Sequence, residues 1–315
     1  MSITQKAVRI VIAPDGAPTE LVVQDVELGT PGPGEVQLQV RAAGINPADL
    51  YGLAPGQRQD HAQPIGYEAA GVVIALGADA STAERPFVIG DEVIVYLAPG
   101  GYASHLNVPA SDVFPKPENV SFPAAANLFL AGLTAAEMLE VTRVTSGDTI
   151  VVHGASGATG VSVIQQAKLI GARVIGTASK RNFDLIRNFG AEPVAYGPGL
   201  EERLRILAPD GVEAALDCVG TEEALAVSLD VVANPSRVVS IANSPLSAKL
   251  GIRYIVGSDP DSYTYRTNQR ERILDLAAQG KLDIPVARTF PLAEAQQALD
   301  LLRTGHPGGK LALIP

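Results

Sequence analysis

Residues 149–160 combine a strand-like apolar run with a glycine turn, and this combination can bind a dinucleotide. The run at 149–154, Thr-Ile-Val-Val-His-Gly, is rich in β-branched residues, which indicates a buried parallel strand. Ala-Ser-Gly-Ala-Thr-Gly follows at 155–160, then an amphipathic stretch from Val161 to Leu169 and a second strand-like run at 173–177. A strand, glycine turn, helix and strand within about 30 residues form the context that a dinucleotide fingerprint requires.

Each small residue of this turn has a physical task. Gly157 lets the backbone approach a pyrophosphate, and Gly160 lets the helix pack close to the strand, while the helix N-terminus offers unpaired N–H groups to the phosphates. The first glycine of the fingerprint is replaced by alanine, a small departure from the pattern. We predict cofactor contacts along the whole turn: Ala155, Ser156, Gly157, Ala158, Thr159 and Gly160.

The residues after the second strand predict the choice between NAD(H) and NADP(H). NAD sites usually place a carboxylate there to hold the ribose 2′-hydroxyl, whereas this chain has Ala178 followed by Ser179, Lys180 and Arg181. A hydroxyl and two cations can bind a 2′-phosphate by charge-assisted hydrogen bonds. The alternative is a pair of solvated residues at a helix start, but cations there oppose the helix dipole. We therefore predict NADP(H).

Composition and charge exclude several classes of protein. A length of 315 residues suggests about two domains, and a hydrophobic fraction of 46% supplies large cores. The net charge of −10 argues against nucleic acids and anionic membranes as main partners. Neither the N-terminal residues nor the uncharged run 120–136 resembles a signal peptide or a membrane span, so we expect a cytoplasmic protein. With Cys218 as its single cysteine, the chain has no intrachain disulfide.

The character of the chain changes near residue 120. Before it, short β-like runs alternate with Gly- and Pro-rich turns, which predicts an irregular domain with a strongly curved sheet (7–12, 21–26, 35–43, 71–76, 92–97 and 105–108). After it, a helix at 123–142 is followed by alternating strands and helices, which predicts a doubly wound parallel sheet (strands 149–154, 173–177, 193–196, 213–218 and 237–241). Two helices, at 268–279 and 292–304, precede a last strand at 310–314, which we expect to return to the first domain.

Several motifs together resemble those of the zinc-free medium-chain dehydrogenases/reductases, the branch that contains NADPH:quinone reductases and ζ-crystallin. They are AGINPAD at 43–49, GYEAAGVV at 66–73, GDEV at 90–93, GGYASH at 100–105, HGASG at 153–157 and Gly309-Lys310. The resemblance implies an α/β protein with a GroES-like, mostly β catalytic domain at 1–120, completed by about 285–315. It also implies a Rossmann domain with a doubly wound parallel sheet at 121–284, with NADP(H) in the cleft between the two domains. A homodimer through an edge strand near 251–256 is a further implication.

The same resemblance predicts that there is no metal. In zinc alcohol dehydrogenases of this superfamily a cysteine stands at the place of Asn46 and a histidine at the place of Tyr67. Catalytic zinc needs about three N, S or O side-chain ligands. The cysteines of the structural zinc lobe are absent too, and the four histidines share no ligand spacing.

Without zinc, the acceptor must delocalise the incoming hydride charge by itself. We therefore predict an enzyme, an NADPH-dependent oxidoreductase that transfers hydride to a small-molecule quinone or α,β-unsaturated carbonyl. One alternative is an enoyl-thioester reductase, which needs a basic groove for coenzyme A phosphates. No such cluster is evident beyond Arg58 and the residues assigned to NADP. Another is a cofactor-binding regulatory or structural protein with vestigial activity, and a zinc alcohol dehydrogenase is the most distant alternative.

The resemblance also assigns catalytic residues. Asn46 would hydrogen-bond the substrate carbonyl or the nicotinamide ribose, or alternatively form an Asx turn with Asp49. Tyr51 would line the substrate pocket or belong to the core, and Tyr67 would face the vacated metal region. Related reductases often carry a further tyrosine where this chain has Gln57-Arg58-Gln59, so we expect solvent or the cofactor ribose to deliver the proton. His61, in a polar loop, is a weaker candidate for the proton donor, since a solvated loop histidine is the better explanation.

The remaining predicted cofactor contacts lie at the ends of other elements. Thr134 matches a threonine that meets the nicotinamide end, although its hydroxyl can also bond to its own helix. Tyr196 would stack on adenine or be an ordinary surface tyrosine. Lys310 matches a basic residue near the adenosine phosphate, or belongs only to an edge strand. Four more residues end strands beside the ribose and the nicotinamide: Val219, Gly220, Ile241 and Ala242.

Overall fold

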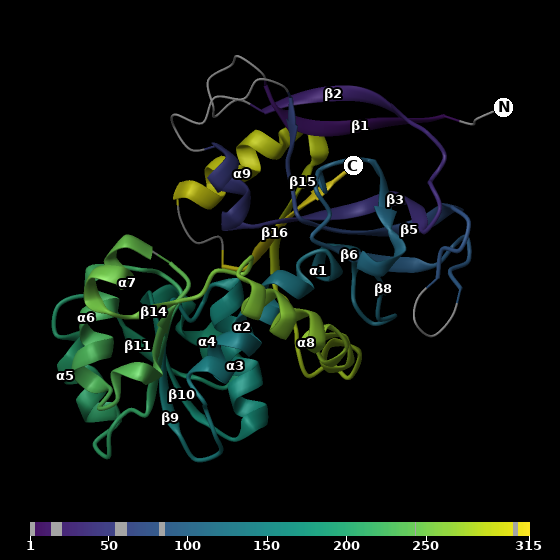
Figure 1. The fold of residues 1–315 in the computed structure, drawn as a ribbon. Coiled ribbons are helices and arrows are strands. Elements are labelled where there is room, and N and C mark those ends of the chain that lie inside the picture. The colour runs from purple at the N-terminus through teal and green to yellow at the C-terminus, as the bar shows by residue number, and fades with distance from the viewer. Residues whose placement is uncertain (1–3, 14–20, 54–61, 82–85, 243, 305–307) are drawn as a thin grey trace. The chain divides into compact units, whose positions relative to one another are not determined.

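The computed structural model describes residues 4–13, 21–53, 62–81, 86–242, 244–304 and 308–315 (Figure 1). The chain divides into two compact units, one made of residues 1–130 and 284–315 and the other of residues 131–283. Each unit is built on β-sheet of its own. The boundary lies at residue 130, later than the change of sequence character near 120.

The strands of the first unit form a larger and a smaller sheet. The larger has the order β15-β16-β3-β5-β6-β8, with β7 also paired to β3, and the smaller has the order β2-β1-β4. The strands are β1 Gln5–Ile12, β2 Leu21–Leu28, β3 Glu35–Ile45, β4 Gln63–Pro64, β5 Glu68–Leu76, β6 Glu92–Tyr96, β7 His105–Pro109, β8 Val113–Pro115, β15 Val286–Pro291 and β16 Lys310–Ile314. Because β16 pairs with β3, the C-terminal end of the chain returns to the first sheet.

The long strand β3 organises this unit. Its pairing with β5 shifts register at Gln37/Leu38 and again at Val40/Ala42, and such bulges bend a strand. The same pairing sets Gly44 opposite Glu68, and the pairing with β16 sets Ile45 opposite Leu311. Asn46, which follows Ile45, therefore meets Glu68 and Lys310 at the end of β3, although the three residues are far apart in sequence.

The second unit is a doubly wound parallel sheet, as the sequence predicted. Its order is β11-β10-β9-β12-β13-β14, so the chain winds outward from β9 in one direction and from β12 in the other. The strands are β9 Thr149–His153, β10 Arg173–Ala178, β11 Glu192–Ala195, β12 Ala214–Asp217, β13 Val238–Ser240 and β14 Arg253–Tyr254. Ligands of such sheets bind at the carboxyl ends of the strands, near the place where the winding reverses.

Helices cover both faces of this sheet (Figure 1). Ile150 and Val152 of β9 pack in one hydrophobic cluster with side chains of α3, whereas Val151 packs in another with side chains of α5 and α6. The helices of the chain are α1 Phe122–Ala125, α2 Leu128–Val141, α3 Ala158–Ile170, α4 Phe183–Phe189, α5 Leu200–Leu207, α6 Glu222–Val231, α7 Ser244–Leu250, α8 Pro260–Ala278 and α9 Ala295–Thr304. A strand buried on both faces explains the continuous apolar run at 150–152.

Two helices differ from the prediction. The helix predicted at 123–142 is divided into α1 and α2 at Asn127, whose amide donates hydrogen bonds to the carbonyls of Pro123 at 2.8 Å and Leu311 at 3.2 Å. Helix α8 begins at Pro260 rather than near 268. Its first turns are polar, because Ser262 and Arg266 bind the buried carboxylate of Glu137, and this removes the apolar periodicity that marks a helix in sequence.

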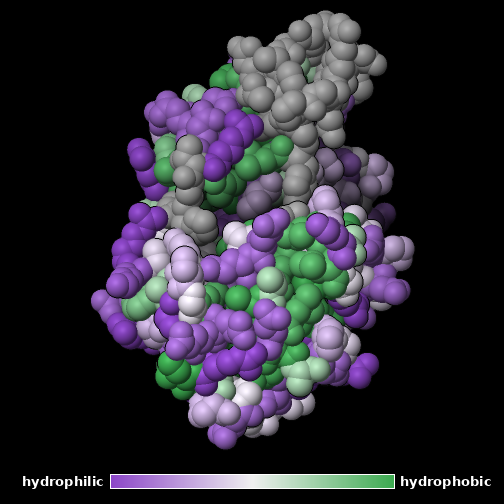
Figure 2. All heavy atoms as spheres, turned by 90° about the vertical axis from the view of Figure 1, so that its left-hand side faces the viewer, coloured by the Kyte–Doolittle hydropathy of each residue, from purple (hydrophilic) through white to green (hydrophobic). Residues whose placement is uncertain are grey.

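One face of the molecule is mixed in character. Figure 2 shows the face that turns left in Figure 1, where hydrophilic side chains lie beside smaller hydrophobic areas. Within the described ranges, none of the helices combines the length and apolar content that a membrane crossing needs.

Candidate functional site

The turn between β9 and α3 depends on glycine at several positions. Gly154 has a left-handed backbone with φ of +72°. A Cβ on Gly160 would lie 2.4 Å from the carbonyl oxygen of Gly154 and 2.8 Å from Cα of Ala155, distances that no side chain tolerates. Glycine at this position therefore lets α3 begin directly against the turn.

The alanine that replaces the first fingerprint glycine is matched by a glycine on the neighbouring strand. Ala155 is fully buried, and a Cβ on Gly176 of β10 would lie 2.7 Å from the Ala155 methyl group. The N–H of Ala155 donates to the carbonyl of Thr177 at 3.1 Å, which fixes the turn against β10. The space for the methyl group therefore comes from Gly176.

The N-terminus of α3 is open to an anion. Gly157 is its N-cap and supplies no side-chain hydrogen bond. Among the described residues, no group accepts a hydrogen bond from the N–H of Ala158 or Thr159, whereas the N–H of Val161 bonds back to Gly157 at 2.8 Å. Unpaired N–H groups and the helix dipole favour a phosphate at this end, so the turn fits the pyrophosphate of a dinucleotide.

The side chain of Ser156 is committed within the protein. It is 4% exposed, and its Oγ accepts a hydrogen bond from Nδ2 of Asn182 at 3.0 Å. Asn182 ends the short 3-10 helix η3 (Lys180–Asn182), so this bond ties the glycine turn to the segment that follows β10. The sequence did not single out Asn182.

The basic pair after β10 is free to bind an anion. Ala178 is buried at the end of the strand, whereas Lys180 and Arg181 are exposed. Within the described part of the chain, neither cation is paired with a carboxylate. Ser179 precedes them as the N-cap of η3 and makes no side-chain capping bond. These features are the ones from which the sequence predicted 2′-phosphate binding.

The carboxyl ends of β12 and β13 are joined through Asp217. Its fully buried carboxylate accepts hydrogen bonds from the N–H of Val219 at 3.1 Å and of Gly220 at 2.9 Å, and from Oγ of Ser240 at 2.6 Å. The Ser240 Oγ also accepts from the N–H of Ala242 at 3.1 Å. Burial raises the pKa of Asp217. Asp217 thus caps the turn, and these N–H groups of Val219 and Gly220 are not available to a ribose.

A buried histidine lies beneath the glycine turn. His153 ends β9 and is 1% exposed, and burial lowers its pKa to about 4, so the ring is neutral at pH 7. Its Nδ1 lies 3.3 Å from Oγ1 of Thr177, which also accepts from the N–H of Gly154 at 3.3 Å. Its Nε2 has no partner among the described residues. His153 therefore supports the turn from below.

The first unit contains a buried charged cluster at the end of β3. The Asn46 amide donates to Oε2 of Glu68 at 3.0 Å, and its carbonyl oxygen accepts from Nζ of Lys310. Lys310 also donates to the carbonyl of Ile45 at 2.8 Å, and Glu68 accepts from the N–H of Leu130 at 2.8 Å. Burial raises the pKa of Glu68 and lowers that of Lys310, and the opposite charge of each partner opposes these shifts.

This cluster gives two of the predicted contact residues partners inside the first unit. Lys310 is 6% exposed and its ammonium is bound inside the first unit, so it is not free to bind the adenosine phosphate. The Asn46 side chain is fully buried between Glu68 and Lys310, so neither the predicted substrate contact nor the Asx turn describes it. The capping bond runs the other way, from the N–H of Asn46 to the Asp49 carboxylate at 2.7 Å. The physical reason is the register of β3 with β5 and β16.

Asp49 links this cluster to two tyrosines. Its Oδ2 accepts from the hydroxyl of the fully buried Tyr102 at 2.6 Å, and its Oδ1 has no partner within the described residues. Burial raises the pKa of Asp49 to about 7. Tyr67 is 39% exposed, and partial burial together with the charge of Asp49 raises the pKa of its phenol. Tyr67 therefore presents a neutral hydroxyl at pH 7.

Other predicted residues are placed less fully. Thr134 is buried on α2, and no bond from its hydroxyl to its own helix is found in the described residues, unlike Thr142, which donates to Met138 at 2.7 Å. Ile241 follows β13, and its N–H donates to the carbonyl of Asp217 at 3.1 Å. Several predictions lie outside the described residues: the side chain of Tyr51, the segment Gln57-Arg58-Gln59, and His61.

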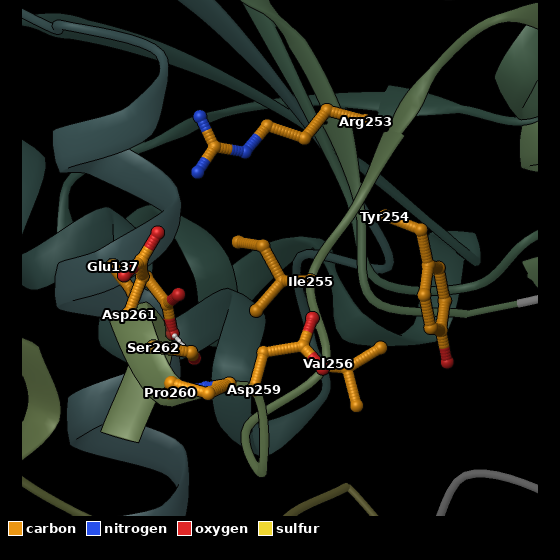
Figure 3. A pocket seen from close by; sticks show the side chains of 9 residues that line it. All are labelled: Glu137, Arg253, Tyr254, Ile255, Val256, Asp259, Pro260, Asp261 and Ser262. Carbon is orange, nitrogen blue, oxygen red and sulfur yellow. Dashed lines mark hydrogen bonds between the residues drawn. The ribbon is translucent and has the colours of Figure 1, made fainter. Parts of the chain in front are cut away.

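A pocket of about 380 Å³ in the second unit contains none of the predicted residues (Figure 3). It lies beside β14 and the start of α8. The guanidinium of Arg253 extends toward the side where Glu137 and Asp261 lie, and Glu137 is held by Ser262 at 2.7 Å. Tyr254 points away from the other lining side chains.

Two family models match the chain in the order that the fold suggests. The alcohol dehydrogenase GroES-like domain matches residues 32–118, and the zinc-binding dehydrogenase model matches residues 189–313. The first match lies within the first unit, whose strands are mostly antiparallel. The second includes β12, β13 and β14 of the parallel sheet and extends into β16.

Individual relatives match over nearly the whole chain. A quinone oxidoreductase of Pseudomonas aeruginosa is 32% identical, over 98% of this chain and 100% of its own length. The chain belongs to the quinone oxidoreductase family. A 2-haloacrylate reductase of a Burkholderia species is 29% identical over 97% of this chain and 98% of its own. The solved structure of mycobacterial Rv1454c complexed with NADPH is 26% identical, with a TM-score of 0.82 over 98% of this chain and 100% of that one.

One of the two matching family models is described as a zinc-binding dehydrogenase. The two positions at which the sequence analysis looked for zinc ligands, Asn46 and Tyr67, carry other side chains. Where zinc enzymes of the superfamily have a cysteine and a histidine, this quinone oxidoreductase family member has a buried, fully engaged amide at Asn46 and a phenol at Tyr67. Within the described ranges, no group of three or more His, Cys, Asp or Glu side chains is arranged to hold a metal ion. These two positions do not fit catalytic zinc.

Three residues of the buried cluster were missed as functional candidates. Asp49, Glu68 and Tyr102 all lie inside motifs that the sequence analysis quoted, so their positions were visible but their partners were not. A single carboxyl in each of two otherwise uncharged motifs, Asp49 in AGINPAD and Glu68 in GYEAAGVV, was the available signal, because a buried carboxylate needs partners.

Proposed function

We propose that this chain reduces quinones and related α,β-unsaturated carbonyl compounds, with NADPH as the hydride donor. The observation that carries the choice of cofactor is the segment after β10, where a buried Ala178 is followed by two exposed cations, Lys180 and Arg181, which no carboxylate of the described residues pairs with. A carboxylate there would repel a 2′-phosphate. The P. aeruginosa and mycobacterial relatives support the same reading through the activity and the ligand in their names.

The second unit would hold the cofactor through backbone and side-chain groups together. The open N-terminus of α3, from Ala158, would bind the pyrophosphate, and Ser179, Lys180 and Arg181 would bind the 2′-phosphate. Thr134 and the ends of β12 and β13 would orient the nicotinamide half: Val219, Gly220, Ile241 and Ala242. The reduced nicotinamide supplies the hydride, and a quinone or enone accepts it without a metal because its own π-system spreads the charge.

In the first unit we propose Tyr67 as the residue that meets the acceptor. Its phenol is partly exposed and stays neutral at pH 7, so it can donate a hydrogen bond to a carbonyl oxygen that gains charge. Asn46 would act indirectly, as part of the buried cluster that supports Asp49 beside Tyr67. For Tyr51 we keep the proposal that it lines the substrate pocket.

The assembly and location are further proposals. We propose two domains, one made of residues 1–130 and 284–315 and the other of residues 131–283, because the chain divides into these two compact units. A homodimer through β14 is supported by the position of that strand at the end of the order of its sheet. We also propose a cytoplasmic protein, for which the use of one cysteine in 315 residues is suitable.

The cofactor proposal is tested by comparing NADPH and NADH as reductants of a panel of quinones, enals, 2-haloacrylate and acyl-thioesters. We expect NADPH to be preferred, and Lys180→Ala to raise the KM for NADPH about tenfold or more while leaving the KM for NADH unchanged, because one charge-assisted bond is lost. Lys249→Ala, an exposed lysine of the same unit, is the matched control.

Equal rates with both cofactors, together with an unchanged NADPH preference in Lys180→Ala, would overturn the 2′-phosphate assignment. Tight NADPH binding with no oxidation above background on any acceptor would instead identify a cofactor-binding regulatory protein. Turnover confined to acyl-thioesters would identify an enoyl-thioester reductase.

A further inference from the structure

The turn after β11 presents an exposed aromatic side chain. Tyr196 directly follows Ala195, the last residue of β11, and is 59% exposed. Gly197 and Gly199 have left-handed backbones with φ of +100° and +81°, so the chain turns sharply on both sides of Pro198. An exposed tyrosine on such a turn would ordinarily be mobile.

One arginine binds the carbonyl groups of this turn. Arg203 of α5 donates from Nε and Nη2 to the carbonyl of Ala195 at 3.2 and 2.8 Å, and from Nη2 also to the carbonyl of Gly197 at 2.8 Å. Its Nη1 donates to the carbonyl of Pro198 at 2.8 Å. No carboxylate in the described residues pairs with Arg203. Its planar guanidinium donates to three backbone carbonyls, which belong to residues on either side of Tyr196 in the chain.

A glutamate of helix α6 also binds this turn, by accepting a hydrogen bond from one of its N–H groups. Oε2 of Glu223, near the start of α6, accepts from the N–H of Gly197 at 2.9 Å. The N–H and the carbonyl of Gly197 are therefore both fixed by charged side chains. Bonds to charged groups are stronger than neutral ones, so the backbone next to Tyr196 is held firmly while its side chain remains exposed.

The place of this turn points to a ligand. It lies at the carboxyl end of β11, the edge at which doubly wound sheets bind their ligands. β11 pairs with β10, and the segment after β10 carries Lys180 and Arg181. An aromatic face beside two free cations suits a purine that carries a phosphate.

We propose that Arg203 and Glu223 are positioning residues that preform the Tyr196 turn as a stacking surface for the adenine of the cofactor. This inference rests on the proposed function. Neither side chain touches the cofactor. Their effect is to remove the ordering cost that binding would otherwise incur at Tyr196, and preorganisation of this kind increases affinity without adding a contact.

The experiment measures the adenosine half of the cofactor by itself. Calorimetric titration with adenosine 2′,5′-bisphosphate needs no turnover, so it remains informative if the proposed reaction is wrong. We expect Tyr196→Ala to weaken binding about fivefold, the typical value of one aromatic stacking contact. We expect Arg203→Met to weaken it by a similar factor, and the double variant to be no weaker than Tyr196→Ala alone.

Matched variants separate positioning from general damage. Arg205→Met removes an exposed arginine from the same helix, and Glu223→Gln keeps an oxygen that can accept from Gly197, so both are expected to bind like the wild type. Glu223→Ala is expected to resemble Arg203→Met. With reduced nicotinamide mononucleotide, which lacks adenosine, kcat/KM is expected to be the same in the wild type and in all variants at Tyr196, Arg203 and Glu223.

Two results would overturn the proposal. The first is an additive double variant, which would mean that Arg203 acts independently of Tyr196. The second is a loss in Arg203→Met that is as large with the mononucleotide as with NADPH, which would mean general damage to the unit. If the wild type binds the bisphosphate but oxidises NADPH with no acceptor, the proposed function fails while this inference stands.

Discussion

The buried cluster of Asn46, Glu68 and Lys310 gives one lysine partners that the sequence did not predict. Glycine followed by lysine at the end of the chain matches a basic residue near the cofactor in relatives, yet the Lys310 ammonium is held by Asn46 and Ile45. A buried charge is stable only with partners, and the loss of one partner leaves the other uncompensated. The lysine is therefore assigned to stability.

This assignment predicts that Lys310→Met lowers the free energy of unfolding by about 3–5 kcal/mol, because Glu68 then stays buried without a positive charge. The double variant Lys310→Met/Glu68→Gln is expected to recover most of that loss. Urea unfolding measures both, with Lys249→Met as the exposed control. A variant that keeps its stability but loses affinity for adenosine 2′,5′-bisphosphate would return Lys310 to the cofactor site.

At the scale of elements, the dinucleotide turn depends on packing between β9, β10 and α3. Ala155 stands where the fingerprint has glycine, and Gly176 of the neighbouring strand β10 leaves the space that the Ala155 methyl group occupies. The sequence showed the departure at Ala155, but only the pairing of the strands shows its compensation.

We expect Gly176→Ala to reduce the free energy of unfolding by about 1–3 kcal/mol, since its methyl group would lie 2.7 Å from that of Ala155. Adding Ala155→Gly should restore most of the stability, because the two positions then exchange their methyl group. Thermal unfolding and bisphosphate binding check the pair. A double variant that is as unstable as the sum of its single variants would show that Ile186, which lies 3.2 Å from the same Cβ position, causes the strain.

At the scale of the whole molecule, the position of β14 at the end of its sheet is the feature that bears on assembly. Val256 follows this strand and is 38% exposed. If two copies join through this edge, a charge at Val256 would be buried twice in the same interface.

Sedimentation velocity tests this proposal. We expect the wild type to sediment as a dimer and Val256→Glu to shift it toward monomer at micromolar concentration. Val88→Glu, which changes a valine that is 55% exposed in the first unit, should leave the dimer intact. A wild type that is monomeric at all concentrations, or a dimer that is indifferent to Val256→Glu, would refute the proposed interface.

The sequence by itself determined the features that depend on neighbouring residues. The glycine turn at 154–160, the alternation of strands and helices, and the cations at Lys180 and Arg181 are all visible within windows of a few residues, because turns and amphipathic periods are local. The sequence predicted helix boundaries poorly where polar side chains are buried, because such residues break the apolar period. Thus α8 begins at Pro260, since Arg266 bonds to Glu137 inside the unit.

Only the tertiary structure decided which buried polar groups meet. Asn46, Glu68 and Lys310 are separated by up to 264 positions, and strand register brings them together. A one-residue slip in register would turn each side chain to the other face of the sheet, so no local pattern encodes these contacts. For the same reason the sequence named Lys310 and Asn46 as ligand contacts, whereas the fold uses both to stabilise charge inside the first unit.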